Sequence, residues 1–353
     1  MLQPASRQFF LGANTGAGFV SLYDELIPPE ENGFLWCVKG GPGNGKSTLM
    51  RRAAERAVQA GLAVEYVLCS GDPDSLDGIY IPEKRIGYVD ATSPHVQEPK
   101  IPGFTGRYLD LSRFYRPIPP ETAEKLGALF AAYRAEYARA YDLLHAASLC
   151  AAGGIPGLVT ADAQSRVRAL AGSIADSVLT DGASDAERRR FLSACTCRGC
   201  VLLGGTAAQY GSVYTLESEL GLTDMFLRAV LEAARARKTA RIVCPDPLDP
   251  SRLAALILPE QRLSLVAVSG AFRYDGTIAR HFHLDEAATI SEEDRERILR
   301  SSALCTAATE QAVTALRRAK TLHDALEAEY RPFVDFPSLT RFEEKHLETA
   351  FPA

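Results

Sequence analysis

The feature that constrains this chain most is a glycine-rich segment, Gly40-Gly41-Pro42-Gly43-Asn44-Gly45-Lys46-Ser47, which fits the pattern G-x-x-x-x-G-K-[ST]. A short apolar run, residues 34–38, precedes it, and residues 48–60 alternate apolar and basic side chains as an amphipathic helix does. A strand, a glycine loop and a helix in this order make up a phosphate-binding P-loop. The segment therefore predicts an α/β domain with a phosphate site.

Each residue type in this motif has a chemical role. Glycines let successive backbone N–H groups approach one anion, and the unpaired N–H groups at the start of the helix add to them. Lys46 is expected to contact the β and γ phosphates, and Ser47 to offer its hydroxyl to Mg²⁺. We therefore expect ATP and Mg²⁺ to be held by Gly40, Gly41, Pro42, Gly43, Asn44, Gly45, Lys46, Ser47 and Thr48.

A second apolar run, residues 85–90, ends in a carboxylate, Asp90. In P-loop proteins an acid at the end of a strand beside the loop orders Mg²⁺. Between the two motifs we expect a strand at residues 63–69 and a turn at residues 72–78 that leads into a short helix. Asp90 is therefore predicted to be a metal ligand together with Ser47, and a catalytic residue together with Lys46.

The residue that would activate water is less evident, because no glutamate follows Asp90. His95, Asp72 and Asp74 are the candidates, since the carboxyl ends of neighbouring parallel strands converge on the phosphates. His95 has an alternative role as an anchor of the loop at residues 92–120, which is rich in Pro, Gly and Ser. Candidate cations for the transferring phosphoryl group or for a lid are Arg85, Arg107, Arg113 and Arg116.

Composition limits the class of protein. The chain has 353 residues, of which 46% are hydrophobic and 24% charged, with a formal net charge of -5, so we expect globular domains rather than a nucleic-acid or anionic-membrane binder. No apolar run is long enough to span a bilayer and no secretory signal is evident, so we expect a cytoplasmic protein. Long helices are expected at residues 121–152, 161–179 and 291–330.

Cysteines and histidines are expected to be structural. Eight cysteines are too few for a disulfide scaffold, and Cys195, Cys197 and Cys200 lack a fourth metal ligand nearby, which favours free thiols at a helix-to-turn junction over a metal site. Core or surface roles are also expected for four histidines that have no acid-histidine set near them in sequence: His145, His281, His283 and His323.

The second half of the chain repeats the first. Residues 10–20 match residues 191–201 at an offset of 181, and residues 72–85 match residues 249–262 at an offset of 177. We therefore expect two tandem P-loop NTPase-type α/β domains, at residues 1–180 and 181–353, with three layers, mostly parallel sheets and long helical tails.

The second copy has lost its phosphate-binding residues. Leu222 stands where the first copy has Lys46, and Ala267 stands where it has Asp90. Glu217 and Glu219 occupy the region where phosphates would bind, and like charge opposes that binding. One nucleotide site, in the first copy, is therefore expected.

The sequence also resembles, over nearly its full length, a poorly characterised bacterial family of tandem P-loop ATPase-like proteins. The resemblance is carried by GGPGNGKST at residues 40–48, CSGDPDSLDG at 69–78, VDATSPH at 89–95, FLSACT at 191–196 and HDALEAEYRPFVDF at 323–336. It implies nucleotide binding, although members of that family typically keep a P-loop in both halves.

Three functions are consistent with these features. The first is a Mg-dependent ATPase or ATP-driven switch, in which the second domain offers a surface for a protein partner or an effector. The second is a nucleotide or small-molecule kinase, and the third is a nucleotide-sensing module with negligible turnover.

Overall fold

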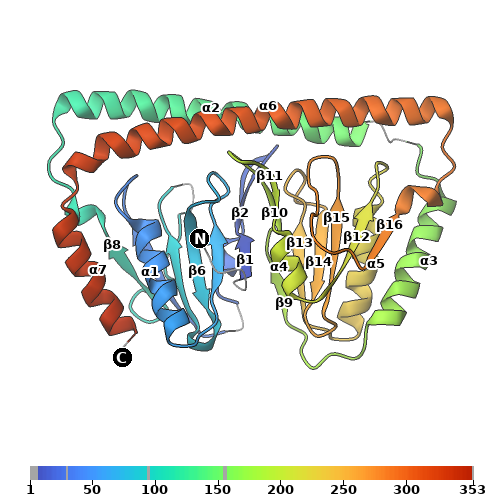
Figure 1. The fold of residues 1–353 in the computed structure, drawn as a ribbon, viewed down its shortest axis with the longest axis horizontal. Helices are drawn as coiled ribbons and strands as arrows, with labels where there is room; N and C mark the ends of the chain where they lie inside the picture. Colours follow the sequence, from blue (N-terminus) through green and yellow to red (C-terminus); the bar gives the residue numbers. More distant parts are fainter. Residues whose placement is uncertain (1–6, 29–30, 94–95, 154–156, 352–353) are drawn as a thin grey trace. The chain divides into compact units, whose positions relative to one another are not determined.

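The computed structural model describes residues 7–28, 31–93, 96–153 and 157–351, and it confirms the expected α/β class. The chain forms two compact units (Figure 1). Unit 1 comprises Met1–Gly12, Ser21–Arg139 and Thr314–Ala353, and unit 2 comprises Ala13–Val20 and Ala140–Val313. Each unit contains one mixed six-stranded sheet.

The sheet of unit 1 has its glycine-rich loop at the end of an inner strand, with a parallel strand on each side. Its strand order is β1 (Arg7–Phe10), β5 (Glu65–Leu68), β6 (Leu76–Ile81), β7 (Ile86–Asp90), β4 (Phe34–Lys39) and β8 (Gly106–Asp110). Strand β4 pairs in parallel with both β7 and β8, β1 pairs in parallel with β5, and β6 runs antiparallel to both of its neighbours.

One expectation about this sheet was wrong. The short helix expected after residues 72–78 is strand β6, which makes the sheet mixed, although β6 alone runs against the other strands of this sheet, as expected for a mostly parallel one. Gly78 is the reason for the error, because it serves close strand pairing instead of a turn: a Cβ there would lie 2.9 Å from the Tyr88 carbonyl oxygen. The described part of residues 92–120 is largely loop, as expected, apart from β8 and a short 3-10 helix at Ser112–Phe114.

Helices α1 (Lys46–Gln59) and α7 (Phe336–Ala350) cover the sheet of unit 1, and Figure 1 shows α1 lying over β6. Helix α1 buries Leu49, Met50 and three alanines at helical spacing, and full burial of each of the two large side chains contributes about 1.5–3 kcal/mol. Helix α7 begins at a cap in which the Asp335 carboxylate accepts a hydrogen bond from the Ser338 N–H at 3.3 Å.

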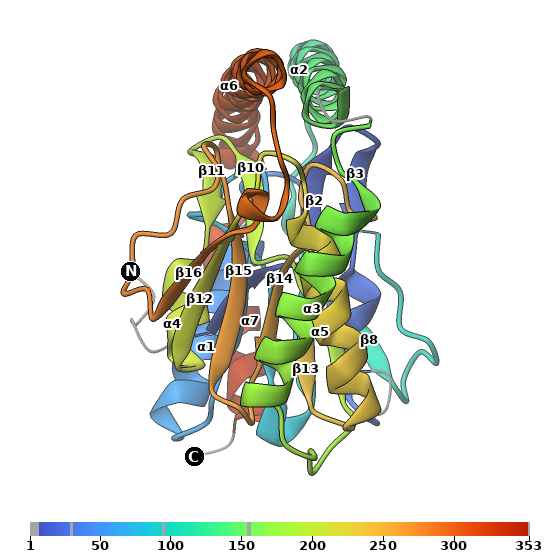
Figure 2. The same ribbon diagram turned by 90° about the vertical axis from the view of Figure 1, so that its right-hand side faces the viewer.

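Unit 2 repeats this arrangement strand by strand. Its order is β9 (Glu187–Arg189), β13 (Arg241–Pro245), β14 (Leu253–Leu258), β15 (Leu263–Val268), β12 (Ser212–Glu217) and β16 (Arg280–His283), with the same sequence of parallel and antiparallel pairs as in unit 1. Helices α3 (Ala161–Val178) and α5 (Thr223–Ala236) lie side by side over this sheet (Figure 2). A short helix, α4 (Gly204–Gln209), follows β11 (Gly199–Leu202).

Backbone conformation also repeats between the two sheets. Arg85 and Arg262, which the 177-residue offset aligns, are two of the three described non-glycine residues with positive φ, at 54° and 50°. The third, Lys238 at 51°, aligns with Gly61 at 75°. Because such conformations are rare for side chains with a Cβ, their recurrence at aligned positions supports the sequence alignment independently of residue identity.

The boundaries of the compact units differ from the expected division at residue 180, because the helices that follow each repeat belong partly to the other unit. Helix α3 follows the first repeat but packs on α5 of unit 2, and α7 follows the second repeat but packs on α1 of unit 1. The long helices α2 (Pro120–Gly153) and α6 (Glu292–Tyr330) each contribute residues to both units. The glycine-rich loop of the first repeat therefore belongs to the same compact unit as the tail of the second repeat.

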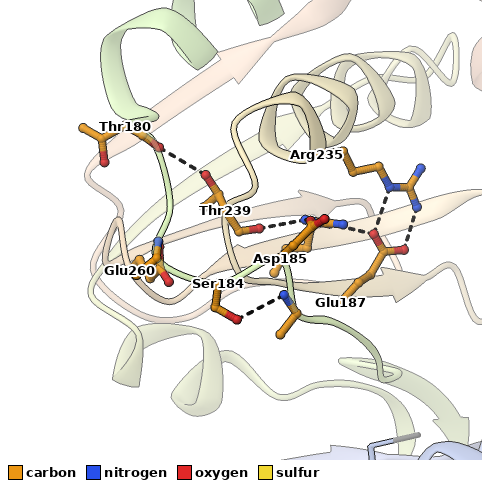
Figure 3. A network of polar contacts seen from close by, with 10 residues as sticks. Thr180, Ser184, Asp185, Glu187, Arg235, Thr239 and Glu260 are labelled. Carbon is orange, nitrogen blue, oxygen red and sulfur yellow. Dashed lines mark hydrogen bonds and ion pairs between the residues drawn. The ribbon is translucent and has the colours of Figure 1, made fainter. Parts of the chain in front are cut away.

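One edge of unit 2 is held by an ion-pair network (Figure 3). The Glu187 carboxylate accepts hydrogen bonds from Arg235 at 2.6 and 2.8 Å and from Arg241 at 2.6 Å, and Arg241 also pairs with Asp185 at 2.8 Å. The two guanidinium groups lower the pKa of Glu187 to about 2. Because the Arg241 side chain is only 6% exposed, the network fixes how β9 enters the sheet.

Two further expectations concern membranes and thiols. Within the described residues, no helix is both long and apolar enough to cross a bilayer.

Cys195 and Cys200 face each other, with their sulfur atoms 3.3 Å apart, across the hairpin of β10 (Ser193–Thr196) and β11, rather than at the expected helix-to-turn junction. All eight cysteines are free thiols.

Candidate functional site

The glycine-rich loop, residues 40–45, connects the carboxyl end of β4 to the first turn of α1. Gly43 and Gly45 have φ values of 71° and 89°, which side chains with a Cβ rarely adopt. Gly45 is also the N-cap of α1 and offers no capping side chain, so the N–H groups of Lys46, Ser47 and Thr48 have no side-chain cap from that residue. These N–H groups form a ready site for an anion.

Asn44 is a loop residue whose side chain is buried with its polar atoms unsatisfied. The side chain is 1% exposed, and neither polar atom of its amide has a hydrogen-bond partner among the described residues. A Cβ at Gly40 would lie 2.0 Å from the Asn44 amide nitrogen, so only glycine fits there. Because an unpaired buried amide is costly, this loop retains hydrogen-bonding capacity for another state.

Lys46 lies folded back onto the loop. Its Nζ donates to the Gly40 carbonyl oxygen at 2.8 Å and to the Gly41 carbonyl oxygen at 2.9 Å, and it lies 3.6 Å from Asp90 Oδ2. The ammonium therefore interacts with carbonyl dipoles and one carboxylate at the position from which it would reach an anion held by the loop.

The two residues predicted to bind Mg²⁺ lie on neighbouring elements of this site. Asp90 ends β7, whose register with β4 pairs it with Val38, and its Oδ1 accepts a hydrogen bond from the Thr92 N–H at 2.9 Å. The Ser47 hydroxyl oxygen accepts a hydrogen bond from the Leu76 N–H at 3.0 Å. Because that interaction uses one lone pair, the hydroxyl keeps the other for a hard cation.

Helix α6 supplies residues that the sequence did not indicate as part of the site. Gly43 packs directly on this helix, because a Cβ at Gly43 would lie 3.2 Å from Glu327 Cβ and 3.3 Å from its Cα. We call Lys320, His323, Asp324 and Glu327 the α6 cluster, and all four line the same cavity as the glycine-rich loop. Sequence offers two signals for them: their spacing of three and four residues, and the place of His323, Asp324 and Glu327 in the segment HDALEAEYRPFVDF at residues 323–336.

His323 is the most chemically capable member of the α6 cluster. Its Nδ1 lies 3.7 Å from Glu327 Oε1, and its ring lies 5.9 Å from that of Tyr133, centroid to centroid. Burial lowers the pKa of His323 and the positive charge of Lys46 lowers it further, against the opposing effect of Glu327. The imidazole is therefore neutral near pH 7 and able to accept a proton.

Lys320 joins the α6 cluster to the end of β5. Its Nζ lies 3.4 Å from Asp72 and 2.5 Å from Asp324. Asp72, one of the acids proposed from sequence to activate water, is thus engaged in an ion pair at the cavity wall, whereas Asp74 is not among the cavity-lining residues.

The cavity bounded by these groups has a volume of about 870 Å³, which is the size of a cofactor site. Aromatic side chains from α2 form part of its wall, namely Phe130, Tyr133 and Tyr137. Arg331, which follows α6, also lines the cavity and adds a positive charge that no sequence motif indicated. The glycine-rich loop, positively charged side chains and aromatic rings therefore line one cavity.

The arginines proposed from sequence lie elsewhere. Arg85 precedes β7, at the end opposite Asp90, which places it about 16 Å away at the usual rise of a strand. Arg113 stacks on the rings of Phe114 and Phe342, with 5.5 and 5.8 Å to the ring centroids. Neither of these lines the cavity, and the same holds for Arg107 and Arg116. His95 lies outside the described residues.

The corresponding loop of unit 2, residues 218–222, is occupied by the protein itself. Asp285 accepts hydrogen bonds from the Glu219 N–H at 2.7 Å and from the Ser218 hydroxyl, and Arg252 donates to the Gly221 carbonyl oxygen at 2.6 Å. The cavity over this loop has a volume of about 180 Å³, too small for a nucleotide. A carboxylate of the chain takes the place that an anion would need.

Comparison with protein-family models, with curated proteins and with solved structures gives no match for this chain.

Proposed function

We propose that unit 1 binds ATP together with Mg²⁺ and hydrolyses it, as an ATPase or ATP-driven switch. The observation that carries the proposal is the convergence of three features on one cavity: the N-terminus of α1 behind a glycine-rich loop, Lys46 3.6 Å from Asp90, and the unpaired buried amide of Asn44. This arrangement suits a polyphosphate better than any single feature does.

Binding would rearrange hydrogen bonds that the loop makes with itself. When Lys46 leaves the carbonyl oxygens of Gly40 and Gly41 for a phosphate, those oxygens need new donors. The Asn44 amide nitrogen, packed against Gly40, is an unpaired donor beside this part of the loop. Nucleotide binding thus satisfies the buried amide as well as the ammonium.

Ser47 and Asp90 would hold the metal ion, since a hydroxyl and a carboxylate are the oxygen ligands that Mg²⁺ prefers. The ion would neutralise phosphate charge, which is the chemistry it supplies in sites of this kind. Lys46 and Arg331 add fixed positive charge on the protein side.

His323 is our candidate for the base that accepts a proton from the attacking water, with Glu327 orienting its ring. Because its pKa is lowered, the ring stays neutral until the pH falls below its usual titration range, and turnover should decline only there. His323→Asn should lower turnover by about 10²- to 10⁴-fold with Mg-ATP affinity nearly unchanged. Turnover equal to that of the wild-type chain would exclude this role.

The role as a switch is supported by the contact between Gly43 and Glu327, because a change in the loop conformation alters how α6 packs on it.

Phosphate release should be measured with Mg-ATP alone, then with nucleoside monophosphates and other acceptors. Release without an acceptor supports an ATPase. Release only with an acceptor would replace this proposal with a kinase, and tight binding without release would leave a nucleotide sensor.

A further inference from the structure

Two histidines and a glutamate meet at the edge of the unit 2 sheet, and we propose that they bind a divalent transition-metal ion, with Zn²⁺ as the best-fitting ion. His281 and His283 lie on β16, and Glu217 ends the neighbouring strand β12 (Figure 2). Parallel pairing sets His283 opposite Glu217 and His281 opposite Thr215. The three side chains are called the His-His-Glu set below.

The spacing of the donor atoms fits a small tetrahedral ion. Glu217 Oε2 lies 3.3 Å from His281 Nε2 and 3.1 Å from His283 Nδ1, and the three atoms all lie within 4.8 Å of one another. Ligand atoms bound at 2.0–2.1 Å to a tetrahedral ion are about 3.3–3.4 Å apart. A bound ion would therefore require only small movements of the side chains.

The remaining nitrogen of His281 is already held in the way that metal-bound histidines are. Its Nδ1 lies 2.7 Å from the Thr215 hydroxyl oxygen. When Thr215 accepts a hydrogen bond from Nδ1–H, the lone pair of Nε2 faces the Glu217 carboxylate, and a cation between them resolves the repulsion. Thr215 is buried, so this orientation is set by the interior of the sheet.

The equivalent edge of unit 1 shows that the fold does not need this set. In the matching register β4 and β8 pair Cys37 with Tyr108 and Lys39 with Asp110. Lys39 there forms an ordinary ion pair with Glu98 at 3.1 Å. Unit 2 instead carries Thr, Glu, His and His at these four positions, which is a metal-ligand combination.

The donor types select the class of ion. Two imidazoles and one carboxylate favour Zn²⁺ and its neighbours in the transition series over Mg²⁺ and Ca²⁺, which prefer oxygen ligands. Three protein ligands leave at least one position for water or an external ligand, as in catalytic zinc sites. The site is half-exposed, so such a ligand can reach it.

The test is binding of Co²⁺ and Zn²⁺ to the full chain in the presence of excess Mg²⁺. We expect one ion per chain, displaced by neither Mg²⁺ nor ATP, and Co²⁺ absorption bands of a site with nitrogen and oxygen ligands. His281→Ala and His283→Ala should each weaken binding at least about 100-fold, and Thr215→Val about tenfold. His145→Ala, which changes an exposed histidine of the same unit, should have no effect.

Two results would overturn the proposal. One is a Co²⁺ affinity that the histidine variants leave unchanged. The other is a thiolate-to-metal charge-transfer band that disappears in Cys195→Ser, because the metal would then be held by the thiols of the β10–β11 hairpin. Circular dichroism of each variant shows whether it is folded, and His283→Gln provides a second, shape-preserving change if His283→Ala is not.

Discussion

Substitution of Gly43 tests whether helix α6, in the tail of the second repeat, packs closely on the glycine-rich loop of the first. Substitution with alanine places a Cβ 3.2 Å from Glu327 Cβ and 3.3 Å from the Glu327 backbone, so α6 has to shift by a few tenths of an ångström. At φ 71° the alanine also costs about 1–2 kcal/mol in backbone strain, and crowding a packed contact adds typically about 1–3 kcal/mol. We expect Gly43→Ala to lower the free energy of unfolding by about 2–5 kcal/mol.

Gly61→Ala is the matched control. Gly61 has nearly the same φ, 75°, but nothing lies within 4 Å of the Cβ position, and Lys238 adopts this conformation at the aligned position of unit 2. It should therefore cost only the strain, about 1–2 kcal/mol. The difference between the two variants in urea unfolding isolates the contact with α6.

Equal losses of stability in Gly43→Ala and Gly61→Ala would refute the close seating of α6 on the loop. In parallel, Mg-ATP affinity should fall in Gly43→Ala and stay at the wild-type value in Gly61→Ala, because Gly61 lies at the far end of α1.

Three further predictions concern unit 2. The pKa of Glu187 is about 2 in the folded chain, below its unfolded value of 4.5. Its ion pairs therefore stabilise the fold above about pH 4.5, and this stabilisation is lost as the pH falls towards 2. Glu187→Gln should lower the free energy of unfolding by about 2 kcal/mol in urea at pH 7, and by much less near pH 2. Asp285→Asn should lower the free energy of urea unfolding by about 1–3 kcal/mol, because it removes the charge from the hydrogen bonds that Asp285 accepts from the loop at residues 218–222. Asp275→Asn, at an exposed position, should not lower it, and equal effects of the two changes would contradict the role of Asp285 in holding the loop. Leu222→Ala should cost about 2–5 kcal/mol, because the side chain is 2% exposed in the core, and calorimetry should find its Mg-ATP affinity unchanged; a clear loss would mean that unit 2 also binds nucleotide.

The sequence predicts those parts of the molecule that depend on local chemistry. The strand before Gly40, the helix after it and the long helices all follow from the periodicity of neighbouring residues, and their positions agree with the structure within a few residues. Strand β6 was missed because Pro and Gly near it resemble turn punctuation, although Ile79 and Tyr80 are typical strand residues.

The candidate site could be predicted only in part, because half of it is non-local. Lys46, Ser47 and Asp90 come from one repeat, and pattern alone identifies them. His323 and Glu327 come from the tail of the other repeat, some 280 residues from the glycine-rich loop. Local sequence patterns do not indicate that this tail packs in unit 1. His281 and His283 were expected from sequence to be structural for the same reason, since only the pairing of β12 with β16 brings Glu217 to them.

The most direct test of the central claim is calorimetric titration of Mg-ATP into the wild-type chain and into Lys46→Ala. Lys345→Ala, which removes an exposed lysine of α7 in the same unit, is the control. We expect one site in the wild-type chain and in the control, and at least about 100-fold weaker binding in Lys46→Ala, the equivalent of losing one charge-assisted contact of about 2.7 kcal/mol. Wild-type affinity in Lys46→Ala would contradict the assignment of the glycine-rich loop as the nucleotide site.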